Sequence, residues 1–115
     1  MAEAFHSKLN RLTDEFVGGV YDATDSFPKN ELFGITSQLR RSSLSVMLNY
    51  IEGYARQQKN TYRNFIEIAY GSLKEASYLI YFSYKRGFLH EAQYKELSLL
   101  ADEIGRMMWG FLKTF

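Results

Sequence analysis

Apolar residues recur at intervals of three and four along most of the chain, a spacing that places them on one face of an α-helix. The first such segment runs from about Glu3 to Ser26. Pro28 cannot continue a helix, and it biases Phe27 before it away from helical backbone. The pattern predicts a long amphipathic helix that ends shortly before the proline. Its apolar positions are Phe5, Leu9, Leu12, Phe16, Val20 and Phe27.

A second helix is predicted from about Leu32 to Gln58. Two positions on its main face, Ser43 and Gly53, are small and would let a neighbouring helix approach closely. The polar run 57–60 that follows is typical of a turn. The main face comprises Leu32, Ile35, Leu39, Ser43, Val46, Tyr50 and Gly53.

The third predicted helix spans about Thr61 to Arg86, with Asn60 as its N-cap. Gly87 stands where a left-handed C-terminal cap is expected, and Phe88 follows it in position to pack back on the helix. The fourth helix is predicted to start near His90, with Gln93 completing an imperfect capping box. Its apolar positions are Leu97, Ala101, Ile104, Met108, Phe111 and Phe115.

Short turns between helices of similar length favour antiparallel neighbours. The chain has 115 residues, a single proline and no linker-like or repeated segment, so one domain accounts for residues 1–115. The sequence therefore predicts an all-α fold, an antiparallel up-down-up-down four-helix bundle.

The second helix carries a further apolar face, formed by Leu44, Met47, Leu48, Ile51 and Ala55, and the third helix is apolar around its circumference from 78 to 84. Hydrophobic residues make up 46% of the chain, whereas a bundle needs about three positions in seven for its core. A wide core with solvent-lapped tyrosines could absorb the surplus, but self-association accounts for it better. The expected oligomer interface comprises Leu44, Met47, Leu48, Ile51, Tyr78, Tyr81 and Tyr84.

A polar row lies between the two apolar faces of the second helix, at Arg41, Ser45, Asn49, Glu52 and Arg56. From 29 to 63 the chain holds six basic residues and two acids. The row could be a solvated or mutually paired face, a phosphate-binding strip, or a buried network that fixes register. Candidate nucleic-acid residues are Lys29, Arg40, Arg41, Asn49, Glu52, Arg56, Lys59 and Arg63.

Little in the sequence indicates catalysis. Glu3 and His6 form one Glu-x-x-His pair, whereas a di-iron bundle needs two such pairs and two further carboxylates. No nucleophile elbow, phosphate loop or dinucleotide fingerprint occurs. We expect no enzyme activity, no cofactor and no metal.

The formal net charge of +1 gives no general attraction to nucleic acid or anionic membranes. There is no cysteine, the N-terminus is charged and amphipathic, and no apolar run is long enough to span a bilayer. A soluble, cytoplasmic protein without a membrane partner is expected.

Three segments stand out by their residue order: 27–29 (FPK), 33–43 (FGITSQLRRSS), and 49–53 (NYIEG) with Arg56. They resemble the bacterial four-helix bundle proteins encoded in 23S ribosomal RNA intervening sequences, and the last is similar to that family's Asn-Ile-Ala-Glu-Gly-x-x-Arg signature. Phe65, Ala69, 71–72 and Glu75 match its third helix, and 87–94 its last turn.

The resemblance implies a homopentameric barrel of four-helix protomers without enzyme activity, so the expected partner is the chain itself. A related branch, the accessory variability determinants of diversity-generating retroelements, binds reverse transcriptase and nucleic acid. RNA, DNA or a nucleic-acid enzyme is therefore an alternative partner. Met47 stands where many members have proline, which predicts a straighter second helix.

Overall fold

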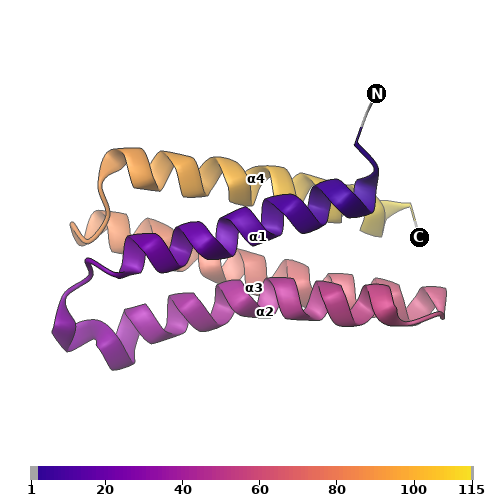
Figure 1. The fold of residues 1–115 in the computed structure, drawn as a ribbon, viewed down its shortest axis with the longest axis horizontal. Coiled ribbons are helices and arrows are strands. Elements are labelled where there is room, and N and C mark those ends of the chain that lie inside the picture. The colour runs from indigo at the N-terminus through magenta and orange to yellow at the C-terminus, as the bar shows by residue number, and fades with distance from the viewer. Residues whose placement is uncertain (1–2, 115) are drawn as a thin grey trace.

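Four helices form an antiparallel bundle in the computed structural model, which describes residues 3–114 (Figure 1). They are α1 (Phe5–Thr24), α2 (Ser37–Ala55), α3 (Lys59–Lys85) and α4 (Glu91–Lys113). Successive helices reverse direction in Figure 1, and both chain ends lie at the same end of the bundle. Helices α1 and α3 each contact both α2 and α4. The predicted all-α bundle is confirmed.

The core follows the helical spacing expected from the sequence. Leu9, Phe16 and Val20 of α1 are fully buried, as are Leu39 and Tyr50 of α2. The buried positions of the other two helices again recur at intervals of three and four. They are Ile66, Ala69, Leu73, Ala76 and Ile80 of α3, and Leu97, Ala101, Ile104, Met108 and Leu112 of α4.

The connection between α1 and α2 differs from the prediction. A 3₁₀ turn (Lys29–Glu31) and one turn of π-helix (Leu32–Thr36) precede α2, which starts at Ser37 instead of Leu32. Gly34 has non-helical backbone angles, with φ −108° and ψ −114°, so residues before it do not continue the face of α2. Leu32 is therefore 49% exposed, and its assignment to the main face was wrong. Phe33 is almost wholly exposed.

The turn between α2 and α3 lies earlier in the chain than predicted. Helix α2 ends at Ala55, because Arg56 and Gln58 have extended backbone, and α3 starts at Lys59. An N-cap is the last non-helical residue before a helix, which makes Gln58 the N-cap. Asn60 lies inside the first turn, so its predicted role was wrong.

Both ends of the last turn match their predictions. Gly87 has φ 81°, and the Phe88 N–H donates to the Ser83 carbonyl (2.9 Å), as in a Schellman cap. The Phe88 ring packs against Phe27, with 5.6 Å between centroids. His90 is the N-cap of α4, and its N–H donates to Gln93 Oε1 (2.9 Å). The predicted apolar position Phe115 lies outside the described residues.

Helices α2 and α3 approach closely where the sequence predicted small residues. Ser43 is fully buried. A Cβ placed on Gly53 would lie 2.5 Å from Cβ of Phe65, a separation that no real side chain tolerates. Gly53 thus sets how near α3 can lie to the end of α2.

Candidate interaction surfaces on the second and third helices

The further apolar face of α2 is open to solvent in the single chain. Leu48 is 59% exposed and Ile51 48% exposed, while Leu44 and Met47 are half-buried and Ala55 is exposed. We call these five residues the α2 stripe. The bundle core therefore leaves this surface uncovered.

None of the described helices is long and apolar enough to cross a membrane.

The inner part of the polar row joins α2 to α3. The hydroxyls of Ser45 and Ser72 are hydrogen-bonded at 2.8 Å. Asn49 Nδ2 donates to the Ser45 carbonyl (2.9 Å) and to Ser45 Oγ (3.0 Å). Ser45 and Asn49 are half-buried, so this part of the row is a hydrogen-bonded seam between two helices.

The outer part of the row faces solvent. Arg56 donates to Glu52 at 2.8 Å, and both side chains are about half exposed. The Arg56 guanidinium also lies over the Phe65 ring, 5.6 Å from its centroid. Arg41 is exposed. The row thus combines a seam with a solvated ion pair, two of the three interpretations that the sequence left open.

The basic residues proposed for phosphate binding do not form one strip. Arg40 points to α1, where Nε donates to Thr24 Oγ1 (2.8 Å), a terminal nitrogen to Asp25 (3.2 Å), and the guanidinium stacks on Tyr21 (4.9 Å). Arg63 donates to Glu67 at 2.9 Å.

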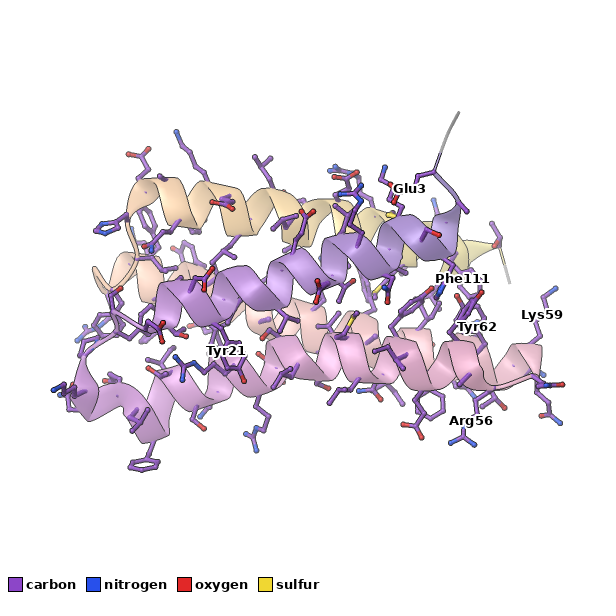
Figure 2. The ribbon with its side chains drawn as sticks, viewed as in Figure 1. Glu3, Tyr21, Arg56, Lys59, Tyr62 and Phe111 are labelled. Atoms are coloured by element: carbon purple, nitrogen blue, oxygen red, sulfur yellow. The ribbon has the colours of Figure 1, made fainter. Side chains whose placement is uncertain are left out.

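These basic residues also lie at opposite ends of the bundle. Arg41 and Arg56 are about 22 Å apart along the axis of α2. Figure 2 shows Arg56 and Lys59 at one end of the molecule and Tyr21, the partner of Arg40, toward the other. Lys29 belongs to the 3₁₀ turn before α2.

The third-helix aromatics occupy a different surface from the α2 stripe. Tyr78 is 62% and Tyr81 48% exposed, and their rings are in contact with 6.4 Å between centroids. At about 100° per residue, Tyr81 lies opposite Ser72 on α3, and Ser72 faces α2. Tyr84 is half-buried and stacks on Tyr94 of α4, with 4.2 Å between centroids and 5° between planes.

An aromatic cluster that the sequence did not predict lies at the end of the bundle where the two termini are. His6 Nδ1 is hydrogen-bonded to the Tyr50 hydroxyl, and the His6 ring stacks on Tyr54 at 3.4 Å. Burial raises the pKa of Tyr50 and of Tyr62 above the usual range. His6 and Tyr50 are 44 residues apart, and no local pattern signals their contact.

Glu3, considered with His6 for metal binding, bonds Arg11 instead, at 2.8 and 3.1 Å. This hydrogen bond lowers the pKa of the Glu3 carboxyl. Within residues 3–114, no three His, Asp or Glu side chains gather into a metal-binding group.

A model of the 23S rRNA-intervening sequence protein family matches residues 7–110. The chain belongs to this family. Its fold is similar to the crystal structure of a protein of unknown function from the S23 ribosomal protein family of Bacteroides thetaiotaomicron VPI-5482, with a TM-score of 0.87. The two are 18% identical, over 96% of this chain and 99% of that one. None of the curated proteins compared with the chain matches it.

The residues of α2 that resemble the signature of the 23S rRNA-intervening sequence proteins have structural roles here. Asn49 belongs to the seam, Glu52 and Arg56 pair, and Gly53 admits Phe65. Helix α2 runs uninterrupted through Met47.

Proposed function

We propose that this chain is a non-enzymatic binding scaffold that acts as a closed homo-oligomer, with five copies as the number that the family resemblance implies. The observation that carries the proposal is the exposure of Leu48 and Ile51 on α2. Contiguous apolar surface on a folded chain marks an interface or an aggregation hazard. A closed ring of copies hides such a surface without leaving an open edge.

The α2 stripe is rigidly presented, which favours a specific interface over adhesive contact. The seam from Ser45 to Ser72 and the contact of Gly53 with Phe65 fix α2 against α3. Glu52 and Arg56 border the stripe with opposite charges, and such a polar rim is typical of protein interfaces. Packing one α2 stripe against a neighbouring copy removes Leu48 and Ile51 from water.

The scaffold role is proposed as non-enzymatic because neither histidine of the chain is arranged as a general base beside a nucleophile. His6 is bonded to Tyr50 and stacked on Tyr54. His90 caps α4, where its backbone N–H is bonded to Gln93. Neither histidine has a serine hydroxyl as a hydrogen-bond partner among the described residues.

Introducing a negative charge into the α2 stripe tests the proposal. Leu48→Glu should give a monomer by size-exclusion chromatography with light scattering, while circular dichroism shows unchanged helix content. Leu99→Glu is the matched control, because Leu99 lies on α4 and is even more exposed at 69%. Loss of assembly in Leu48→Glu alone supports the α2 stripe, whereas equal assembly of both variants and wild type refutes it.

The alternative, a nucleic-acid-binding module on the basic residues of α2 and α3, has weaker support. Arg40, Arg56 and Arg63 each pair with a carboxylate of the same chain. Phosphate contacts would have to compete with these pairs. Weaker binding of Arg40→Gln and Arg56→Gln to mixed nucleic acids in a salt titration would support this alternative.

A further inference from the structure

A surface groove between α3 and α4 combines aromatic rings with basic side chains. The Trp109 ring stacks on Tyr70, with 5.8 Å between centroids and 29° between planes, and Trp109 remains 50% exposed. Lys74 Nζ lies over the Tyr70 ring, 5.2 Å from its centroid. Together with Arg106 these residues line a pocket of about 210 Å³.

The pocket continues along the two helices. Ser77, Ala101 and Asp102 line both this pocket and an adjoining one of about 240 Å³ that reaches Tyr94. Trp109 and Tyr94 are therefore the two ends of one groove. Their separation of 15 residues along α4 corresponds to about 22 Å, which suits an extended chain better than one small molecule.

The two cations of the groove are not neutralised by ion pairs. Unlike Arg40, Arg56 and Arg63, neither Lys74 nor Arg106 forms an ion pair with a carboxylate of residues 3–114. Glu103 is bonded to Lys8 at 2.9 Å, which lowers the pKa of its carboxyl, and Arg106 adds a smaller effect through space.

An exposed indole beside cations that lack a carboxylate partner has the chemistry that recognises nucleotides. Every base has a flat π-face that stacks on an aromatic ring, and stacking is tolerant of sequence. Phosphates of the same strand attract lysine and arginine at adjacent positions. We propose that this groove binds single-stranded nucleic acid, with a base stacked on Trp109 and phosphates held by Lys74 and Arg106.

Asp102 indicates where along the groove the phosphates of the bound strand lie. Its carboxylate lines the groove about 10 Å from Trp109 along α4, where it repels a phosphate. Because Arg106 is only one helical turn from Asp102, the phosphates should lie on the side of Arg106 that faces Trp109, and Asp102→Asn should strengthen binding. This inference does not rest on the proposed assembly, because the groove belongs to α3 and α4 and the stripe to α2.

Trp109 is the only tryptophan of the chain, so its fluorescence reports on the site directly. Wild-type protein is titrated with a single-stranded ten-nucleotide RNA, with DNA of the same sequence, with the matching duplex and with adenosine monophosphate. We expect the single strands to quench the emission. Absence of quenching by both single strands at about 50 mM salt overturns the proposal. Equal affinity for the duplex, or for the mononucleotide, also overturns it.

Variants separate stacking from general charge, with affinity measured by anisotropy of a labelled strand. Trp109→Leu should weaken binding about tenfold. The pair Lys74→Gln with Arg106→Gln should lower the slope of log affinity against log salt by about 1.4. The control pair, Lys85→Gln with Arg86→Gln, removes the same charge at the end of α3, where neither residue lines the groove. If the control pair weakens binding as much as the groove pair, the attraction is non-specific and the proposal fails.

Discussion

Replacing Gly53 by alanine tests the close approach of α2 and α3. The added Cβ would lie 2.5 Å from Cβ of Phe65, whereas carbon atoms in ordinary contact are about 3.5–4.0 Å apart. One helix must therefore move by about 1 Å or more, or Phe65 must leave its position. Movement of Phe65 would also disturb the guanidinium of Arg56, which lies over its ring.

The expected magnitude is a difference of two opposing effects. Overpacking of this kind costs about 1–3 kcal/mol. Alanine favours helix over glycine by about 0.5–1 kcal/mol, which offsets part of the cost. The net loss for Gly53→Ala is about 0.5–2 kcal/mol. For a chain of this size, Tm should fall by about 2–8 °C.

Gly18→Ala supplies a control of opposite sign. Gly18 lies within α1, and nothing lies within 4 Å of a Cβ placed there. Only the helix preference changes, so this variant should be more stable than wild type by about 0.5–1 kcal/mol. Both variants are measured by thermal and urea unfolding at one protein concentration, because assembly makes Tm concentration-dependent. Stabilisation by Gly53→Ala as large as that by Gly18→Ala would show that the helices are not in tight contact.

Three further predictions concern other contacts. Burial raises the pKa of Tyr50, so the folded chain keeps a proton that the unfolded chain loses above about pH 10. The free energy of unfolding should therefore fall as pH rises beyond about 10, and it should fall less steeply in Tyr50→Phe. Urea unfolding at a series of pH values measures both slopes. Gln93→Ala removes the side chain that accepts from the His90 N–H and should cost about 0.5–1 kcal/mol, whereas Gln57→Ala, exposed in a turn, should cost nothing measurable. Ser72→Ala leaves Ser45 without its partner on α3 and should cost about 0.5–1.5 kcal/mol; no loss in chemical unfolding would contradict the seam.

The helices were predictable because their signals are local. Periodic apolar residues such as Leu9 and Phe16 determine which face is buried, and Gly87 marks the end of α3 through its positive φ. The turn before α2 was not predictable, because the non-helical backbone at Gly34 interrupts a pattern that periodicity alone reads as continuous.

A candidate site on a single helix was predictable from the sequence, whereas sites formed between helices were not. The α2 stripe was visible as an apolar period on one helix, and Leu48 and Ile51 are exposed in the folded chain. The groove at Trp109 and Tyr70 and the bond of His6 to Tyr50 depend on pairing between helices. Such pairs become visible only when the relative positions of the helices are known.

The mass of the native assembly tests the central claim most directly. Sedimentation velocity of the unmodified chain across the micromolar range should give one species much heavier than a single chain, with about 67 kDa expected for five copies of 13.4 kDa. A 13.4 kDa species at every concentration would mean that the α2 stripe remains in water, and the scaffold account would be contradicted.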